Sequence, residues 1–375
     1  MNDTQAKYPQ LRFKGFADPW EQCKFSELAD RYDNLRVPIT ASERVAGETP
    51  YYGANGIQDY VEGFTHNGEF VLVAEDGAND LQNYPVQYVD GKVWVNNHAH
   101  VLQAKEERAD NKFLTNALKH TNIEPYLVGG GRAKLNADVM MKINFKVPTL
   151  PEQVQIGKFF DNLDHLITLH EEKKRQLECL KSALLQKMFA DKSGYPVVRF
   201  EGFDKAWEER KLKDVVEKQI KGKAQLEKLA PGEVEYLDTS RLNGGQAILT
   251  NGLKDVTLDD ILILWDGSKA GTVYHGFEGA LGSTLKAYRT SANSKFVYQY
   301  LKRHQDNIYN NYRTPNIPHV QKDFLNVFTI SVPVSDEQEK IGSFFKQLDD
   351  TIALHQRKLD LLKEQKKGFL QKMFV

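Results

Sequence analysis

A tandem repeat is the feature that most constrains how this chain folds. Residues 147–190 and 332–375 align without a gap, 185 positions apart, and share 21 identities in 44 positions. Each copy is preceded by a motif of the form Tyr-Pro-x-x-Arg-Phe-x-Gly-Phe-x-x-x-Trp-Glu, at residues 8–21 and again at 195–208. The parts of the chain between motif and long segment have little sequence in common. The chain therefore holds two copies of one plan, in which similar scaffolds carry different variable segments.

The repeat divides the chain into four parts. At 375 residues the chain is too long for one ordinary domain and fits roughly two or three. We expect residues 1–146 to hold the first motif and a first variable domain, and residues 147–190 to form a long helix. Residues 191–331 would then hold a linker, the second motif and a second variable domain, and residues 332–375 a second long helix.

Each repeated long segment has the pattern of a single helix. Thr149-x-x-Glu152 and Ser335-x-x-Gln338 are capping-box patterns that follow strand-like runs ending in Val-Pro. Apolar residues then recur every seven positions over about 38 residues, which indicates a coiled-coil seam on a helix roughly 57 Å long. The alternative is that each helix packs on its own domain. The expected seam residues are Ile156, Phe160, Leu163, Ile167, His170, Leu177, Leu184, Ile341, Phe345, Leu348, Ile352, His355, Leu362 and Phe369.

Two histidines, His170 and His355, occupy equivalent seam positions near the middle of the two helices. If the helices cross near their midpoints about the internal two-fold, these imidazoles approach each other and stack. The alternative is that they are two unrelated, half-exposed seam residues.

The two variable segments have the pattern of mixed α/β domains. Asp90-Gly91 separates two short strand-like runs and predicts a two-residue hairpin. Each variable segment ends in a strand that leads into Val-Pro. The predicted strands include Glu69–Glu75, Val86–Val89, Lys92–Val95 and Ile261–Trp265, and the predicted helices are Phe113–His120 and Lys295–Gln305.

Motifs for catalysis are missing from the sequence. It contains no G-x-x-x-x-G-K-[ST] phosphate loop, no glycine-rich loop for S-adenosylmethionine or a dinucleotide, and no H-E-x-x-H metal motif. His98 and His100 lie two residues apart, but no cysteine or carboxylate spacing accompanies them that would predict a metal site. Acidic clusters such as Glu171-Glu172 fall on the heptad helix, where a solvated face explains them. We therefore expect neither catalysis nor a bound metal on this chain alone.

Composition indicates a folded protein of a reducing compartment. Hydrophobic residues make up 41% and charged residues 27%, which allows real cores. No apolar stretch approaches the ~18 to 20 residues of a membrane span, and the polar start does not have the pattern of a signal peptide. Two cysteines cannot form a disulfide framework, so we expect a cytoplasmic location. The net charge of −1 gives no bulk sign of nucleic-acid binding, so positive charge must gather on particular faces.

Taken together, these patterns resemble the specificity (S) subunit of type I restriction-modification enzymes, over the whole chain. The resemblance rests on the tandem repeat and on the Pro and Glu-Gln residues that begin each long helix. It also rests on the ending Leu-Gln-Lys-Met-Phe, at 185–189 and 370–374. Short motifs in the variable segments also resemble this family: residues 49–57 read TPYYGANGI, residues 236–240 read YLDTS and residues 265–268 read WDGS.

The resemblance implies a fold of the α+β class, with two globular mixed α/β target-recognition domains joined by two long antiparallel coiled-coil helices. Such a subunit has no catalysis of its own. Each recognition domain would read one half of a bipartite site in double-stranded DNA, and the helices would set the spacer and dock two methyltransferase subunits. Those subunits would use S-adenosylmethionine, and motor-nuclease (restriction) subunits would use ATP and Mg. Since the two variable segments differ, the site should be asymmetric.

Two other functions are open from the sequence alone. One is a two-headed coiled-coil adaptor that binds protein or carbohydrate. The other is a solitary DNA-modifying enzyme with degenerate motifs. DNA modification by the purified chain without partners would favour the enzyme, and failure to bind DNA even with a methyltransferase present would favour the adaptor.

Candidate DNA contacts lie in short polar runs of the variable segments. Alignment of the strand patterns places residues 96–100 opposite 282–286, and residues 129–134 opposite 311–316. Asn bonds adenine, Arg suits guanine or phosphate, and Ser or Thr can bond any base. Strand-end turns, flexible loops and buried tyrosines are the structural alternatives. The candidates are Tyr51, Tyr52, Asn55, Asn97, His98, His100, Arg132, Lys134, Ser240, Arg241, Asn243, Ser268, Lys269, Ser283, Thr284, Lys286, Tyr312, Arg313 and Asn316.

The two variable segments differ in charge. Residues 27–146 contain 12 basic and 17 acidic residues, whereas residues 212–331 contain 15 basic and 13 acidic residues. We therefore expect the first segment to bind DNA poorly by itself, and affinity to depend on the second segment and on partner subunits.

Overall fold

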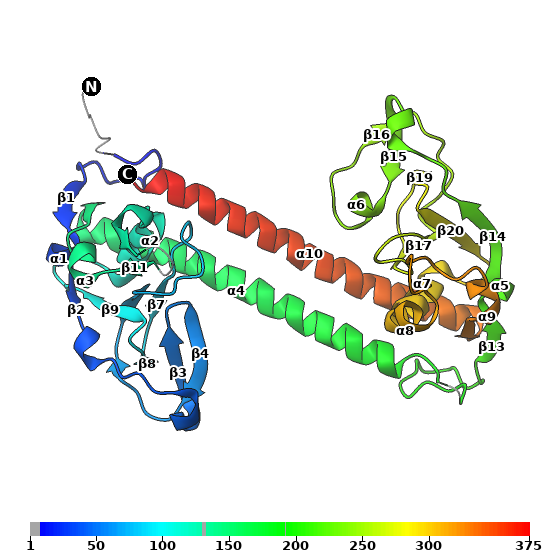
Figure 1. Ribbon diagram of the computed structural model, residues 1–375, viewed down its shortest axis with the longest axis horizontal. Coiled ribbons are helices and arrows are strands. Elements are labelled where there is room, and N and C mark those ends of the chain that lie inside the picture. The colour runs from blue at the N-terminus through cyan, green and yellow to red at the C-terminus, as the bar shows by residue number, and fades with distance from the viewer. Residues whose placement is uncertain (1–7, 130–132, 192) are drawn as a thin grey trace. The chain divides into compact units, whose positions relative to one another are not determined.

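The computed structural model describes residues 8–129, 133–191 and 193–375, and Figure 1 shows its helices and strands, labelled where there is room. The chain divides into two units: unit 1 holds Met1–Glu171 and Arg357–Val375, and unit 2 holds Glu172–Gln356. Each long helix is divided between the units, whereas the four-part division expected from the repeat keeps each helix whole. Both units mix strands and helices, as the sequence predicts.

Unit 1 is built around two four-stranded sheets. The first has the order β2-β9-β6-β7, and its neighbouring strands are antiparallel. The second has the order β4-β3-β8-β5, in which β3 and β8 run parallel. Two further antiparallel pairs are β1-β12 and β10-β11. The strands are β1 Glu21–Lys24, β2 Ala29–Arg31, β3 Ala46–Gly53, β4 Gly56–Val61, β5 His66–Asn67, β6 Phe70–Ala74, β7 Val86–Val89, β8 Lys92–Val95, β9 Ala99–Ala104, β10 Leu127–Val128, β11 Lys134–Leu135 and β12 Asn144–Val147. The short helices are α1 Phe25–Leu28, α2 Asn111–His120 and α3 Ala137–Met140, with 3-10 turns η1 Asp33–Leu35, η2 Ala41–Glu43 and η3 Glu124–Tyr126.

The hairpin expected at Asp90-Gly91 is wrong, although both flanking strands are confirmed. β7 pairs with β6, β8 pairs with β5, and the two ladders are joined by a pair of 3.1 Å backbone hydrogen bonds between Gly68 and Gly91. Asp90 and Gly91 therefore form a bend in one long strand, and the chain reverses at residues 75–85 instead. The turn-forming dipeptide serves the bend because Gly91 has a φ of +87°, which glycine adopts without strain.

Unit 2 repeats this plan with its own residues. Its larger sheet has the order β14-β20-β17-β18 and is antiparallel throughout. A smaller sheet has the order β16-β15-β19, with β15 parallel to β19, and β13 pairs with β21 as β1 pairs with β12. The strands are β13 Glu208–Lys211, β14 Val216–Lys221, β15 Pro231–Leu237, β16 Leu249–Thr250, β17 Ile261–Leu264, β18 Val273–Tyr274, β19 Ala280–Leu281, β20 Leu285–Thr290 and β21 Thr329–Val332. The helices are α5 Leu212–Val215, α6 Thr239–Leu242, α7 Ser294–Arg303, α8 Gln305–Asn311 and α9 Phe324–Val327, with the 3-10 turn η4 Leu226–Lys228.

The two long helices are α4, Leu150–Lys187, and α10, Ser335–Met373. They run antiparallel in each unit, where ion pairs join them. Lys366 donates to Asp164 in unit 1, and Lys181 Nζ lies 2.5 Å from Asp349 Oδ1 in unit 2. All of the expected seam residues are buried or half-buried, but several of them pack in the cores of the variable domains, so the assignment of the seam residues stays a prediction. The approach of the two seam histidines would join residues of different units, and it stays a prediction.

The repeated Tyr-Pro motif holds the start of each long helix. Arg12 donates Nε and Nη2 to the two carboxylate oxygens of Glu152, both at 2.7 Å, and Arg199 binds Glu337 in the same way at 2.8 Å. Both carboxylates are completely buried. The capping-box pattern predicts that the Glu152 carboxylate accepts the backbone N–H of Thr149 at the helix start. In the structure this carboxylate accepts hydrogen bonds from Arg12 instead. In the second copy, Gln338 donates to the carbonyl oxygen of Pro333 at 2.8 Å.

The repeated Leu-Gln-Lys-Met-Phe ending of each long helix inserts its phenylalanine into a core. In unit 1, Phe374 stacks on Phe113 of α2 with ring centroids 5.5 Å apart. In unit 2, Phe189 stacks on Phe296 of α7 at 5.4 Å. Each variable domain is thus packed against the start of one long helix and the end of the other. Among the described residues, no helix combines the length and apolar character needed to cross a membrane.

Candidate nucleic-acid interface

Both units gather polar side chains where the two central strands of one sheet end, the sheet β2-β9-β6-β7 in unit 1 and the sheet β14-β20-β17-β18 in unit 2. In unit 1 the last register pair of β6 and β9 is Ala74 with Ala99, and in unit 2 the last pair of β17 and β20 is Leu264 with Leu285. These registers agree with the alignment of residues 96–100 with 282–286. The segments beyond the pairs begin with Glu75-Asp76 and with Trp265-Asp266, and we call these two places the sheet-end sites.

A third segment closes each sheet-end site. Asp76 forms an isolated antiparallel bridge with Lys134, and Asp266 forms the equivalent bridge with His319. The alignment of residues 129–134 with 311–316 was therefore wrong by three positions, since the counterpart of Lys134 is His319 and not Asn316. The connection is longer in unit 2, where helix α8 takes the place of the β10-β11 pair.

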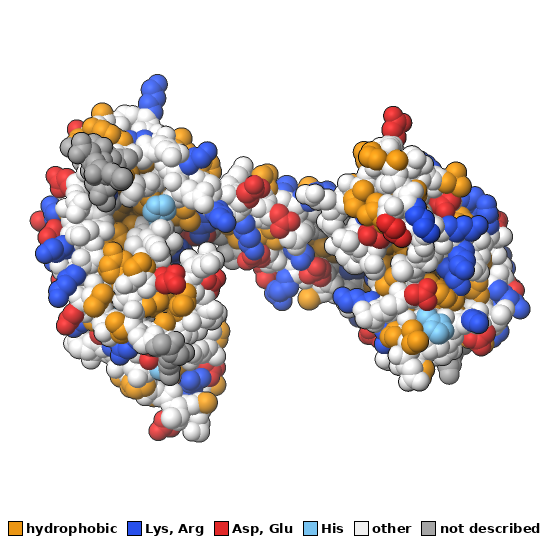
Figure 2. Space-filling model, turned by 45° about the horizontal axis from the view of Figure 1, so that its top comes forward, with side chains coloured by type: hydrophobic (Ala, Val, Ile, Leu, Met, Phe, Trp, Pro, Cys, Tyr) orange, Lys and Arg blue, Asp and Glu red, His pale blue; other side chains and the backbone are white. Residues whose placement is uncertain are grey.

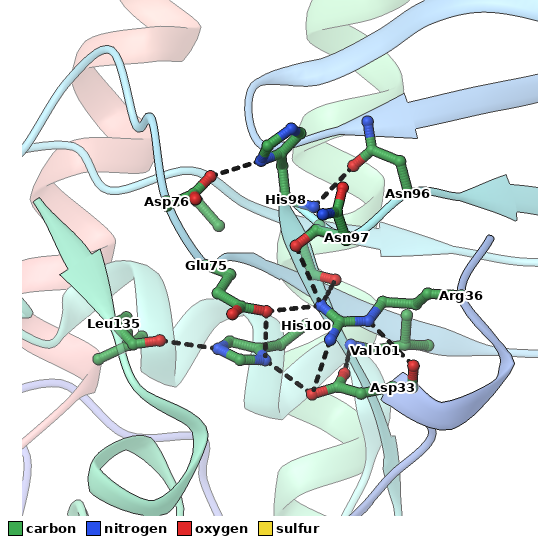
Figure 3. A network of polar contacts seen from close by, with 12 residues as sticks. Asp33, Arg36, Glu75, Asp76, Asn96, Asn97, His98, His100, Val101 and Leu135 are labelled. Atoms are coloured by element: carbon green, nitrogen blue, oxygen red, sulfur yellow. Dashed lines mark hydrogen bonds and ion pairs between the residues drawn. The ribbon is translucent and has the colours of Figure 1, made fainter. Parts of the chain in front are cut away.

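In unit 1 the sheet-end site contains a buried network of charges, which Figure 3 shows. His100 Nδ1 lies 2.8 Å from Asp33 Oδ2, and His100 Nε2 lies 2.8 Å from the Leu135 carbonyl oxygen. Arg36 donates Nη1 to Glu75 Oε2 at 2.7 Å, and Lys134 Nζ lies 2.9 Å from Glu75 Oε1. Burial raises the pKa of Glu75, but hydrogen bonds from Arg36 and Lys134 outweigh it and hold that pKa below its usual value.

The same network contains carboxylate and imidazole groups of the kind that bind metal ions. Ligand atoms of Asp33, Glu75 and His100 lie within 4.8 Å of one another, as a metal site requires. However, Glu75 is already neutralised by Arg36 and Lys134, and the Arg36 guanidinium also lies 3.7 Å from Asp33 Oδ2. A divalent cation would stand beside two fixed positive charges. The arrangement therefore fits an ion-pair cluster and not a metal centre.

Two side chains of unit 1 reach the surface beside this network. Asn97 is exposed, and His98 is half-buried with its Nδ1 2.5 Å from Asp76 Oδ1. The buried Asn96 accepts the backbone N–H of His98 at 2.8 Å and so fixes the turn that presents both residues. An amide and an imidazole held in this way can form hydrogen bonds with base edges.

The other candidates of unit 1 are placed differently. Tyr51 and His100 are 1% exposed, so they belong to the interior and DNA cannot touch them in this structure. Tyr52 is half-buried and packs on a core cluster. Asn55 is exposed, but its side chain bonds Gly77 and Asn79 and so holds that loop. Arg132 lies outside the described residues.

In unit 2 the sheet-end site has different chemistry. Ser283 and Thr284 are exposed, and Lys286 lies over the ring of Trp265, with Nζ 3.1 Å from the ring centroid. A pocket of about 470 Å³ opens here, and its lining includes Lys221, Lys286 and Trp265. Ser283 and Lys286 both line this pocket.

The remaining candidates of unit 2 lie on other segments. Ser268 and Lys269 are exposed beyond β17, where the Ser268 carbonyl oxygen accepts Arg313 Nη1 at 2.9 Å. Tyr312 packs on Phe324 in the core. Ser240, Asn243 and Asn316 are exposed, and Arg241 is half-buried and bonded to Glu235.

The sequence pattern missed several residues of the two sheet-end sites. Asp76 and Asp266 directly follow predicted strands, so their place after the strand was a usable signal. Lys221, Asp33 and His319 come from segments far away in sequence, and only strand pairing brings them to the sites.

Comparison with known proteins adds independent information. A family model described as the type I restriction modification DNA specificity domain matches residues 17–179 and 204–364. A putative type I restriction enzyme specificity subunit from Haemophilus influenzae is 49% identical over 140 residues, which cover 37% of this chain and 36% of that protein. The type I restriction enzyme MjaVIII specificity subunit from Methanocaldococcus jannaschii is 30% identical over 179 residues, covering 45% and 42%. The matches thus span less than half the length of these curated relatives.

One solved structure is similar over the full chain. The crystal structure of a type I restriction-modification system S subunit from M. genitalium covers 98% of this chain and 99% of its own, with a TM-score of 0.78. The sequence identity is 17%, so this likeness concerns the fold.

Proposed function

We propose that this chain, which belongs to the type I restriction-modification DNA specificity family, is the DNA-reading subunit of a methyltransferase complex and performs no catalysis itself. The observation that carries the proposal is the pair of sheet-end sites. Equivalent strand ends in the two units carry different polar side chains, namely Asn97 and His98 in unit 1 and Ser283, Thr284 and Lys286 in unit 2. Two readers of one design with unlike contacts suit an asymmetric, bipartite DNA site.

The sequence has no motif for S-adenosylmethionine, a nucleotide phosphate or a catalytic metal, so we propose that partner subunits supply these groups. Two methyltransferase subunits, docked on the long helices, would bring S-adenosylmethionine, and restriction subunits would bring ATP and Mg. We also propose double-stranded DNA as the substrate and the cytoplasm as the location of the complex. Within this chain, we propose that the exposed candidates at the sheet-end sites contact DNA. We also propose that Lys134, Lys269 and Asn316 contact DNA at the edges of these two sites.

Charge supports unequal roles for the two units. The variable segment of unit 1 has an excess of acidic residues, whereas that of unit 2 has more basic than acidic residues. On the face shown in Figure 2, several Lys and Arg side chains lie next to one another on the surface of unit 2, the lobe on the right. Since backbone neutralisation dominates DNA affinity, unit 2 should supply more of the sequence-independent binding.

Co-expression with a cognate methyltransferase subunit, followed by sequencing for modified bases, tests the proposal. We expect modification at one bipartite sequence, and no modification by the purified chain alone. Exchange of residues 27–146 for another variable segment should change one half of that sequence and leave the other half intact. Modification without a partner would show a solitary enzyme, and no DNA binding even with the methyltransferase would show an adaptor protein.

A further inference from the structure

Two lysines face each other on the larger sheet of unit 2. Lys221 of β14 is the register partner of Lys286 of β20, so both side chains lie on the same face of the sheet. Like charges directly opposite each other in an antiparallel pair destabilise the sheet. Within residues 8–129, 133–191 and 193–375, no ion pair to a carboxylate involves Lys221, Lys286 or the neighbouring Lys322. The sheet therefore carries lysine charges at this place that no direct ion pair neutralises.

The charge of Lys286 is held in position. Its ammonium group lies over the ring of Trp265, which is 9% exposed, and such a contact between a cation and an aromatic face is attractive. Burial lowers the pKa of Lys286, and the charge of Lys221 lowers it further, while Asp266 opposes both. An anion next to the Lys286 ammonium group would oppose this lowering.

The surrounding pocket has the lining that an anion needs. Lys221, Lys286 and Lys322 line it, and the exposed Ser283 adds a hydroxyl group as a further hydrogen-bond donor. Asp266 is the one carboxylate among the lining residues. The volume of about 470 Å³ is large enough for a phosphate with its adjoining sugars.

We propose that this pocket is an anion site, lined by Lys221, Lys286 and Lys322, that binds a backbone phosphate of DNA. The inference rests on the proposed function and deepens it. Phosphate contacts fix the position of a protein on the duplex and carry no direct sequence information, whereas base-edge contacts specify sequence. Lys286 would then position unit 2, and the neighbouring Ser283 and Thr284 would remain to read bases.

Unit 1 does not repeat this site. The position of Lys286 is taken by His100, that of Trp265 by Glu75 and that of His319 by Lys134. There two carboxylates face the two positive charges, because Lys134 and Arg36 pair with Glu75 and Arg36 also pairs with Asp33. The same strand ends thus hold a compensated network in unit 1 and an open cationic pocket in unit 2.

Salt dependence of DNA binding tests the site. The chain assembled with its methyltransferase is titrated with the modified sequence over a range of NaCl concentrations, as wild type and as Lys286→Gln and Lys221→Gln. Each variant should bind about tenfold more weakly at low salt, and the slope of log K against log[salt] should shrink by about 0.9 for one lost phosphate contact. Each variant should lose the same factor in affinity for a duplex altered in the half-site read by unit 2, because a phosphate contact does not depend on the base sequence.

Two controls keep the result interpretable. Lys286→Arg retains the charge and should retain the slope, and Lys254→Gln removes a lysine of an exposed ion pair with Glu278 and should change neither slope nor affinity. Thermal unfolding of each variant shows whether the fold is kept.

The outcomes separate the inference from the proposed function. An unchanged slope together with a changed base preference in Lys286→Gln would assign the residue to base reading and overturn the site. Inorganic phosphate at matched ionic strength should weaken DNA binding of the wild type more than that of Lys286→Gln. A third outcome is that inorganic phosphate binds to the pocket while both Lys→Gln variants keep the wild-type slope. This outcome would assign the pocket to free phosphate and would also overturn the proposed DNA-phosphate site. If the wild-type complex bound no DNA, the proposed function itself would fail.

Discussion

Two buried ion pairs explain why the same short motif stands before each variable segment. Arg12 and Arg199, from the two copies of the motif, each hold a fully buried glutamate at the start of a long helix, Glu152 and Glu337. In each pair two N–H groups of the arginine bond the two carboxylate oxygens, a geometry that lysine could not reproduce. The motif is therefore a structural clasp between the chain and its own helix.

Glu337→Gln should reveal how much this clasp contributes. The substitution leaves the Arg199 guanidinium without its buried counter-charge, and we expect the free energy of unfolding to fall by about 3–5 kcal/mol. Urea denaturation of the assembled chain, followed by tryptophan fluorescence, measures the change. Glu278→Gln, which breaks the exposed pair with Lys254, should cost at most about 1 kcal/mol. Equal losses in the two variants would contradict the role given to the clasp.

A buried histidine predicts how stability depends on pH. His66 is 2% exposed, and its Nε2 lies 3.0 Å from the Tyr32 carbonyl oxygen. Burial lowers the pKa of His66, and the bond to Tyr32 only partly opposes this. The unfolded chain, with an ordinary histidine pKa of about 6.5, then binds more protons than the folded chain as the pH falls. This contribution to stability is present above the unfolded pKa of about 6.5 and is lost as the pH falls from there through the lower pKa of the folded chain.

Urea midpoints measured between about pH 7.5 and about pH 5.5 should therefore fall with pH, in the range set by the ordinary histidine pKa. His66→Asn should show a weaker dependence, because its side chain does not titrate. Burial lowers the pKa of His120, His275 and His304 as well, so part of the slope should remain in the variant. A variant with the same slope as the wild type would exclude His66 as a source.

At the scale of elements, the long helices approach the variable domains closely at one glycine each. A Cβ atom at Gly157 would lie 2.5 Å from Asp110 Oδ1 and 3.1 Å from the backbone N of Phe113, at the start of α2. A Cβ atom at Gly342 would meet Asn293 and Phe296 in the same way at α7. Glycine weakens a helix interior, and here the absence of a side chain lets two helices touch.

Gly157→Ala should therefore destabilise the chain despite the higher helix propensity of alanine. We expect a loss of about 1–3 kcal/mol, because α2 must shift away from α4. Gly368→Ala is the matched control on the other long helix, where a Cβ atom meets nothing within 4 Å, and it should gain up to about 1 kcal/mol. Urea unfolding of both variants gives the comparison, and stabilisation by Gly157→Ala would contradict the close approach.

At the scale of the whole molecule, the internal repeat supplies both ends of each helix with a core. The start of α4 and the end of α10 pack in unit 1, and the end of α4 and the start of α10 pack in unit 2. Each long helix thereby contributes residues to the cores of both units. If α4 and α10 pair through a heptad seam, both helices can be lengthened by whole seven-residue repeats and still pair.

One extra heptad inserted into both long helices tests the proposed role of their length. Seven residues add about 10.5 Å of helix, which corresponds to about three base pairs of duplex. We expect the methylated sequence to keep both half-sites and to gain a longer gap between them. Sequencing of modified bases reads this directly, and an unchanged gap would show that the helices do not set it.

Much of this architecture could be predicted from the amino-acid sequence. The 185-residue repeat predicts two copies of one fold, and the seven-residue apolar period predicts the long paired helices, because these signals depend only on residues near each other in sequence or on direct comparison of the two halves. Short strands such as β6 and β17 were found within one or two residues of their ends. The alignment of His98 with Thr284 also agreed with the strand registers.

The tertiary structure alone decided which side chains meet. Asp90-Gly91 has the composition of a turn, but pairing with residues 66–74 makes it a bend in a strand. The sequence predicts His100 as a DNA contact, but Asp33, 67 residues away, and the Leu135 carbonyl oxygen bond its ring in the interior. Lys221 meets Lys286 only because β14 pairs with β20. Local sequence sets the propensity and period of an element, whereas burial and charge at a site come from contacts between segments far apart in the chain, and no local pattern encodes those contacts.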